Sequence, residues 1–169
     1  MTFVNALRKT FWFISPFFLG LFLILLGQIP TSLMPYYHQS FPFVMGVIFY
    51  FAVFNPKVLN VFLVFLLGLL MDMLTTLPLG FYSFGFVFVF FMATLFQSYL
   101  INMAFKQLWI VFCMFFFCTD VFWAFLFFLI SGTWVSTGFW FVQYIFVCLS
   151  YPFFCRLSGF LNRRILEVQ

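Results

Sequence analysis

Two acidic residues interrupt long apolar stretches of the sequence, and their carboxyl groups are its clearest candidates for chemistry. Asp72 follows Lys57 by about four helical turns, and Asp120 follows Lys106 by nearly the same length of chain. A helical rise of about 1.5 Å per residue would place each carboxyl group about 20 Å from its lysine. Acids at membrane depth are costly to bury and are functional candidates by default. Neither acid has a basic residue within its own apolar stretch.

Three roles are open for Asp72. The interpretation we favour is structural, with the carboxylate accepting hydrogen bonds from backbone N–H groups in the following Thr75–Thr76 turn. The carboxylate could instead be met by a polar or basic group on a partner protein. A proton or ion relay to Asp120 is least favoured, because a relay needs further polar groups and the inner halves of these stretches are mostly Phe, Leu and Val. For Asp120, which follows Thr119, the structural and partner roles stand equally.

The remaining reactive side chains predict no catalytic or metal site. His38 has no second ligand in its loop, so we interpret it as a solvated loop residue. The four cysteines lack CxxC spacing and fall within the apolar stretches, where we expect buried thiols acting as small apolar side chains: Cys113, Cys118, Cys148 and Cys155. The sequence has no phosphate-binding glycine loop, nucleophile–base set or paired-carboxylate site. We therefore expect a protein that is not an enzyme and needs no cofactor or metal.

The composition places these residues in a membrane protein. Of 169 residues, 67% are apolar and 6% are charged, whereas the surface of a soluble domain is about 25–35% charged. A soluble domain, a disordered chain and a nucleic-acid-binding protein are therefore excluded. Phe accounts for 35 residues, so we expect helices packed by interlocking aromatic side chains, with Gly and Ser relieving close contacts. The predicted fold class is an all-α integral membrane protein with a single membrane domain.

Turn residues divide the sequence into six apolar stretches, which we predict to be transmembrane helices. About 20 residues cross a bilayer, and the second and third stretches are short for a full span. The first stretch follows Arg8 and Lys9 and is too long for the apolar region of a signal peptide, so we expect a retained anchor. The predicted spans are residues 10–29, 41–54, 58–74, 81–102, 108–130 and 139–155.

The basic residues predict the orientation of these spans. With a cytoplasmic N-terminus, every Lys and Arg of the sequence falls on the cytoplasmic side, and the three outer loops contain none. The positive-inside rule requires only a bias. This complete separation therefore predicts six spans with the N-terminus and the C-terminus both cytoplasmic. The residues that set this topology are Arg8, Lys9, Lys57, Lys106, Arg156, Arg163 and Arg164.

One stretch of the sequence resembles a family signature. Residues 68–80 read GLLMDMLTTLPLG, which is similar to the G-L-L-x-D-x-L-S-G-x-P-L-G pattern of the bacterial rod shape-determining protein family MreD. In that family the pattern closes the third span. Residues 50–56 resemble the segment that ends the family's second span, although Phe51 stands where the family usually has Trp. Tyr151-Pro152, followed by the basic tail, resembles the family's C-terminal region.

The same stretch also has a physical interpretation of its own. A helix would stop after Asp72, a Thr-rich turn would offer capping groups, and Pro78 would lie in the first turn of the next helix, where proline is tolerated. We call this segment the elbow and expect it to be structural or to fix a surface for a partner. Its candidate residues are Gly68, Asp72, Thr75, Thr76, Pro78 and Gly80, and Thr119 with Asp120 is a second candidate polar contact inside the membrane.

Resemblance to MreD implies a non-catalytic subunit of the cell-elongation (rod) complex in the bacterial inner membrane. Such a subunit associates with MreC, a single-span periplasmic protein. It thereby helps to link the cytoplasmic MreB filament to lateral peptidoglycan synthesis by a RodA-type glycosyltransferase and its transpeptidase. The expected role is cell shape determination, with the partner's span packed against an aromatic face of the bundle.

Two other functions compete with this one. Substrate-binding components of vitamin transporters are also six-span bundles of similar size, and they need a polar pocket that faces outward. The residues that could line such a pocket are Asp72, Thr119, Asp120, Gln143 and Tyr144. A proton-coupled transporter ranks last, because the sequence lacks a polar route to the cytoplasmic side.

Overall fold

The described residues form helices and no strands, in agreement with the predicted all-α class. The computed structural model describes the backbone of residues 2–28, 41–75, 78–132 and 137–166, and the side chains of 14–28, 41–75, 78–130, 132 and 141–165. The helices are α1 (Thr2–Gly27), α2 (Val44–Phe54), α3 (Val61–Leu74), α4 (Phe81–Leu95), α5 (Gln97–Leu100), α6 (Phe105–Ser131) and α7 (Thr137–Leu166).

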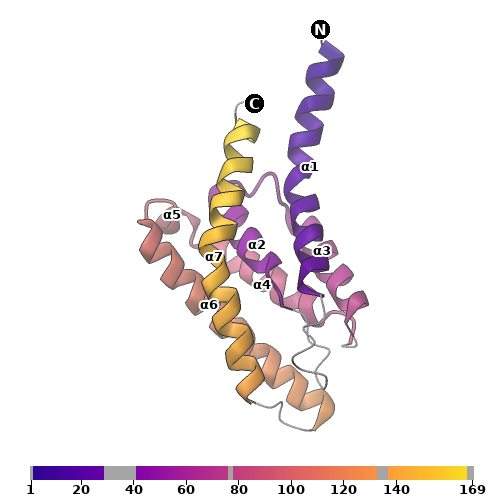
Figure 1. Cartoon of the computed structure of the whole chain (residues 1–169), viewed down its shortest axis with the longest axis vertical. Coiled ribbons are helices and arrows are strands. Elements are labelled where there is room, and N and C mark those ends of the chain that lie inside the picture. Colours follow the sequence, from indigo (N-terminus) through magenta and orange to yellow (C-terminus); the bar gives the residue numbers. More distant parts are fainter. Residues whose placement is uncertain (1, 29–40, 76–77, 133–136, 167–169) are drawn as a thin grey trace.

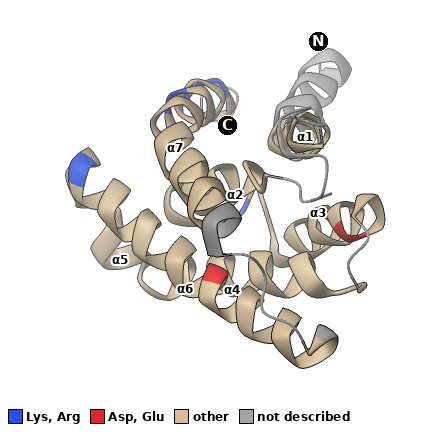
Figure 2. Cartoon of the chain, turned by 60° about the horizontal axis from the view of Figure 1, so that its bottom comes forward, with Lys and Arg blue, Asp and Glu red and all other residues tan. Residues whose placement is uncertain are grey.

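The short helix α2 lies inside a ring formed by α1, α3, α4, α6 and α7 (Figures 1 and 2). Around this ring, α3 packs on α4, α4 on α6, α6 on α7, α7 on α1, and α1 on α3. Helix α2 packs against α1, α4 and α7, and ten of its eleven residues are buried. A helix that is apolar on every side belongs either in a protein core or in contact with lipid. The position of α2 in the middle of the ring gives it the first of these environments.

Aromatic rings in stacked and edge-to-face contacts join the helices in the core, as the Phe content predicts. Phe112 of α6 stacks on Tyr151 of α7 with ring centroids 4.2 Å apart, and Phe49 of α2 lies 5.4 Å from Phe112. Phe116 stacks on Tyr144 at 5.6 Å. Rings of this kind prefer offset-stacked or edge-to-face contacts, which add to the gain from burying their area. The four cysteines are free. Cys148 is buried as expected, Cys113 and Cys155 are half-buried, and the expectation of a buried thiol is wrong for Cys118, which is exposed.

Among the residues whose side chains the structure describes, two helices are long and apolar enough to cross a membrane. They are Phe105–Ile130, with 26 residues and mean hydropathy 2.2, and Phe141–Ile165, with 25 residues and mean hydropathy 1.4. Helices α2, α3 and α4 have 11, 14 and 15 residues. Such helices reach only about 16–22 Å, against a hydrocarbon core about 30 Å thick. The described apolar part of α1, Ile14–Gly27, is also short, so six complete spans stay a prediction.

The fourth predicted span, 81–102, is not one helix. Helix α4 ends at Leu95, and the chain turns at Phe96 before the single turn α5. The Thr94 hydroxyl donates back to the Phe91 carbonyl at 2.8 Å, a contact that bends helices. The Gln97 side chain donates to the Val53 carbonyl of α2 at 2.9 Å. This long-range contact holds the turn against the end of the central helix.

Two other predicted spans are longer as helices than as apolar stretches. Helix α1 begins at Thr2 rather than residue 10 and ends at Gly27. Helix α7 continues beyond residue 155 to Leu166 and carries Arg163 and Arg164 in its last turn. Basic side chains near a helix C-terminus are favourable with the helix dipole. The polarity of this tail therefore ends the apolar stretch without ending the helix.

The described basic residues gather toward one end of the bundle, which we call the basic end. Figure 1 shows that α1 begins, α7 ends, and the α2–α3 connection and α5 lie at this end. Lys57 lies in the α2–α3 connection and Lys106 at the start of α6, and both are exposed. The C-terminal half of α7 carries three exposed arginines: Arg156, Arg163 and Arg164. Arg8 and Lys9 lie in α1, and their side chains are outside the described residues.

Candidate functional site

The Asp72 carboxyl group is the centre of the best-formed polar site in the described structure. Asp72 lies in the last turn of α3 and is 1% exposed. Its Oδ1 accepts a hydrogen bond from the Tyr82 N–H at 2.7 Å. Its Oδ2 accepts from the Gly80 N–H at 2.9 Å, the Ser83 hydroxyl at 2.7 Å and the Ser83 N–H at 3.3 Å. Both oxygens therefore act as acceptors, the role of an ionised carboxylate.

These bonds make Asp72 the cap of α4. The N-cap residue of α4 is Gly80, which has no side chain to offer and adopts a left-handed φ of 100°. The first N–H groups of a helix have no partner within the helix, and the partial positive charge there favours an anion. Asp72 supplies that acceptor from the neighbouring helix. The elbow is thus closed by one side chain that ties the end of α3 to the start of α4.

Gly68 allows α3 and α4 to come close enough for this contact. A Cβ on Gly68 would lie 2.3 Å from the Ser83 Cα and 2.8 Å from the Ser83 backbone nitrogen. Backbone atoms cannot move aside as a flexible side chain can. Gly68 lies one helical turn before Asp72, so the same face of α3 provides both the close approach and the acceptor.

The elbow differs from the sequence prediction at Thr75 and Pro78. The described donors to Asp72 belong to residues 80–83, so the prediction of donors in the Thr75–Thr76 turn is wrong for Thr75. The Thr75 N–H and hydroxyl both donate back to the Met71 carbonyl, each at 3.1 Å. Pro78 precedes the first turn of α4, where its carbonyl accepts from the Phe81 N–H at 3.2 Å. Thr76 lies outside the described residues.

Three residues that the sequence analysis missed extend the site into α6. Ser83 gives two of the four hydrogen bonds to Asp72. Trp123 of α6 donates its indole N–H to the Phe81 carbonyl at 2.9 Å. A Cβ on Gly85 would lie 2.5 Å from the Trp123 ring. A polar Ser and a nearby Gly within the apolar run after Gly80 were the available signal.

Asp120 has a different environment, between α6 and α7. It is 6% exposed, and its Oδ1 is a buried atom without a hydrogen-bond partner among the described residues. The adjacent Thr119 hydroxyl donates to the Phe115 carbonyl of its own helix at 2.9 Å, so it does not serve Asp120. Tyr144 of α7 packs against Phe116 and Phe117, about one turn before Asp120.

The described structure does not join the two acids by polar side chains. Asp72 contacts the backbone of α4, whose first turn presents Phe81 and Tyr82 to Trp123. The Tyr82 ring lies 4.8 Å from the Trp123 ring, edge to face. The two acids lie on separate helices, Asp72 on α3 and Asp120 on α6. An aromatic cluster is a poor path for protons, so this geometry does not favour a relay.

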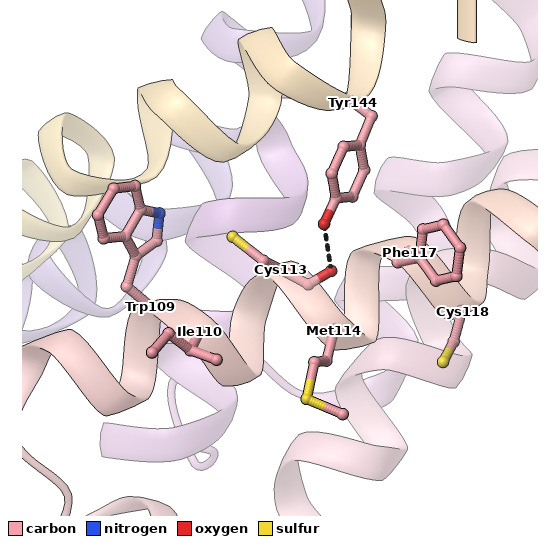
Figure 3. Close-up of a pocket in the computed structure, with 7 residues that line it drawn as sticks. All are labelled: Trp109, Ile110, Cys113, Met114, Phe117, Cys118 and Tyr144. Atoms are coloured by element: carbon pink, nitrogen blue, oxygen red, sulfur yellow. Dashed lines mark hydrogen bonds between the residues drawn. The ribbon is translucent and has the colours of Figure 1, made fainter. Parts of the chain in front are cut away.

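A groove between α6 and α7 opens on the outer face of the bundle (Figure 3). It has a volume of about 390 Å³ and an apolar lining of Trp109, Ile110, Cys113, Met114, Phe117, Cys118 and Tyr144. Two hydrogen bonds join the helices beneath it. The Tyr144 hydroxyl donates to the Cys113 carbonyl at 3.1 Å, and the Trp109 indole N–H donates to the Cys148 carbonyl at 2.9 Å.

The polar residues that could line a vitamin pocket are not gathered in this groove. Tyr144 lines it, whereas Asp72, Thr119, Asp120 and Gln143 are buried in the helix packing. Among the described residues, no group of three His, Cys, Asp or Glu side chains could hold a metal ion.

The hydrogen bonds of Asp72 and the close approach at Gly68 make the elbow a structural connection in which Gly68, Asp72 and Gly80 act together. Asp120 belongs to a separate contact.

Comparisons with protein-family models, with curated proteins and with solved structures found no match for this chain.

Proposed function

We propose that this chain is a multi-pass protein of the bacterial inner membrane. The support comes from the outer surface of the helix bundle, where large apolar side chains are exposed on all five ring helices. Examples are Phe18 on α1, Phe62 on α3, Phe91 on α4, Phe125 on α6 and Phe153 on α7. Apolar surface on every side suits a lipid environment, and basic residues at one end suit a cytoplasmic face.

Within that membrane, the proposed role is that of a non-catalytic subunit of the cell-elongation complex, similar to MreD. The elbow carries this proposal. The residues that resemble the family signature include Gly68, Asp72 and Gly80, and these same residues form the cap between α3 and α4. A carboxylate occupied by four donors is suited to holding a shape rather than to exchanging protons or ligands.

The surface beside the elbow is the proposed docking site for the single span of MreC. Met73, Leu79 and Phe84 adjoin Asp72, Gly80 and Ser83 in the sequence and are all strongly exposed. The cap fixes the backbone next to each of these apolar side chains. The span of MreC would therefore dock on a preformed surface. By binding MreC, this chain would help to link the MreB filament to the RodA-type glycosyltransferase and its transpeptidase.

Replacement of Asp72 tests this role. Asp72→Leu removes the acceptor for four donors, and we expect loss of MreC co-purification and of rod shape when the variant replaces the chain in its native cell. Asp72→Asn keeps the side-chain volume, so we expect it to insert into the membrane. If co-purification and rod shape both survive Asp72→Leu, the proposed role of the elbow is wrong.

A matched pair of phenylalanines tests the surface itself. Phe84 on α4 and Phe153 on α7 are 68% and 67% exposed, so Phe84→Ala and Phe153→Ala remove the same side chain from equally exposed positions. We expect MreC co-purification to fall with Phe84→Ala and to persist with Phe153→Ala. Equal effects would overturn the assignment of this face. A vitamin that co-purifies in place of MreC would support the transporter-component alternative.

A further inference from the structure

A second groove lies toward the basic end of the bundle, where α7 passes α2 and the start of α6. Its volume is about 480 Å³, and it runs along the face of α7 that carries Arg156 and Arg163. Tyr50 of α2 and Phe105 of α6 form its other walls. We call it the basic groove. It is distinct from the elbow and from the groove of Figure 3, with which it shares no lining residue.

The basic groove carries two positive charges without a counter-charge from the described chain. Arg156 and Arg163 are exposed and lie about two turns apart along one face of α7. Neither is paired with a carboxylate among the described residues, whose acids are Asp72 in α3 and Asp120 in α6. Asp120 lies about four turns along α6 from Phe105, a distance of about 22 Å. Glu167 lies outside the described residues.

Apolar rings border the same groove. Phe105 and Phe160 line it and are 48% and 57% exposed. The Phe105 ring stacks on Tyr151, and the Arg164 guanidinium lies 5.5 Å from the Phe160 ring centroid, so each ring is open to the surrounding medium over part of its surface. Gly159 leaves the bottom of the groove open, because a Cβ at this position would lie 3.4 Å from the Tyr50 hydroxyl. The Tyr50 hydroxyl adds a polar group to the same lining. The groove thus combines two guanidinium groups, a hydroxyl and two exposed rings.

This combination matches an amphiphile with a negatively charged head. Guanidinium groups bind phosphate oxygens through paired hydrogen bonds, and basic pockets between membrane helices on the cytoplasmic side bind anionic lipid headgroups. A soluble anion would use the arginines but leave Phe105 and Phe160 unused. We propose that the basic groove binds an anionic phospholipid, with its phosphate at Arg156 and Arg163 and an acyl chain against Phe105 and Phe160. This inference rests on the bilayer placement proposed above and is independent of any protein partner.

Lipid retention by charge-matched variants tests the site. The full chain is placed in nanodiscs of equal phosphatidylglycerol and phosphatidylcholine, re-extracted in mild detergent, and analysed for bound lipid by native mass spectrometry. Arg156→Gln/Arg163→Gln removes two charges from the groove, and Lys57→Gln/Lys106→Gln removes two from elsewhere at the basic end. We expect retained phosphatidylglycerol to fall at least about tenfold in the arginine pair, since each basic residue near the headgroups contributes about fivefold. The lysine pair should keep it.

A variant that fills the groove without changing its charge distinguishes a lipid bound in the groove from lipids attracted to the positive charges in general. Gly159→Leu leaves every arginine in place and occupies the floor, so we expect retained phosphatidylglycerol to fall while the variant still elutes as a folded protein. Retention by the arginine pair, retention by Gly159→Leu, or equal loss in both charge pairs would each overturn the proposal. Inorganic phosphate added during extraction should not displace the lipid. Displacement at millimolar phosphate would assign the site to a soluble anion instead.

Discussion

Asp72 in α3 and Asp120 in α6 are both buried acids within apolar helices, and the groups around them differ. Asp72 receives four hydrogen bonds through both of its oxygens. The Oδ1 of Asp120 has no hydrogen-bond partner among the described residues. Their exposures are 1% and 6%, so burial does not separate them. The two sites differ in the number of hydrogen-bond donors within reach of the carboxyl group.

That supply follows from the positions of the two residues in their helices. Asp72 lies in the last turn of α3, next to the start of α4, where the first backbone N–H groups have no acceptor within the helix. Asp120 lies in the middle of α6, where the surrounding backbone N–H groups are already used by the helix. An acid beside a helix N-terminus can therefore be held as structure, whereas an acid in mid-helix depends on side chains of its neighbours.

The largest expected effect is on stability when each acid is replaced by leucine. Asp72→Leu strands four donors, and each buried group left without a partner costs about 1 kcal/mol or more. We expect the free energy of unfolding in detergent micelles, measured by denaturant titration, to fall by at least about 3 kcal/mol. Asp120→Leu removes a carboxyl group with one unpaired oxygen and should change it by less than about 1 kcal/mol.

Equal losses from the two leucine variants would remove the distinction between the sites. That result would mean that Asp120 is held by donors as effective as those of the elbow. A small loss from Asp72→Leu would mean that α4 can start without the carboxylate cap.

A smaller loss of stability is expected when a side chain is added at the close contact between α3 and α4. Gly68→Ala places a Cβ within 2.3 Å of the Ser83 Cα, so the helices must separate. Overpacking of this kind costs about 1–3 kcal/mol, and it would also lengthen the bonds from α4 to Asp72. Gly46→Ala is the control, because its Cβ would meet its nearest neighbour, the Tyr151 ring, at an ordinary 3.5 Å. A larger loss for Gly46→Ala in the same titration would contradict the proposed close approach.

The sequence predicts the helices better than the contacts between them. The helical regions follow from apolar stretches bounded by turn residues, and each of the six predicted spans overlaps a helix of the structure. The break at Phe96 was missed because it depends on Thr94 bending its own helix and on Gln97 reaching α2. Neither contact alters the apolar pattern on which the prediction rests.

The elbow was predicted in its residues but not in its bonding. Asp72 stood out because an acid in an apolar stretch is costly, and Gly68 and Gly80 belonged to the same motif. The donors are mostly backbone N–H groups of α4, which no side-chain pattern reveals. Trp123 could not be found, because its contact with Gly85 joins two helices that are far apart in the sequence.

The single side-chain donor of the elbow gives a third, smaller effect. Ser83→Ala removes the 2.7 Å hydroxyl bond to Asp72 and leaves the backbone bonds, so we expect a loss of about 1 kcal/mol in the free energy of unfolding. Ser158 is the matched control, because it is equally buried and its hydroxyl has no hydrogen-bond partner among the described residues. Ser158→Ala should be neutral or slightly stabilising. If the two variants lose equal stability, the Ser83 hydroxyl adds nothing to the cap.

The smallest expected effect is that of Asp120→Asn, which also decides between the two roles that the sequence leaves open for this residue. The amide is nearly the same size, and it replaces a carboxyl group whose Oδ1 has no partner in the described chain. If Asp120 serves only this chain, the free energy of unfolding should change by less than about 0.5 kcal/mol and partner co-purification should persist. If the oxygen instead accepts from a donor on a partner helix, the free energy of unfolding of the isolated chain should stay the same while co-purification falls.

A loss of more than about 2 kcal/mol in the free energy of unfolding of the isolated chain would contradict both outcomes. Asp120 would then be held as firmly within this chain as Asp72 is at the elbow.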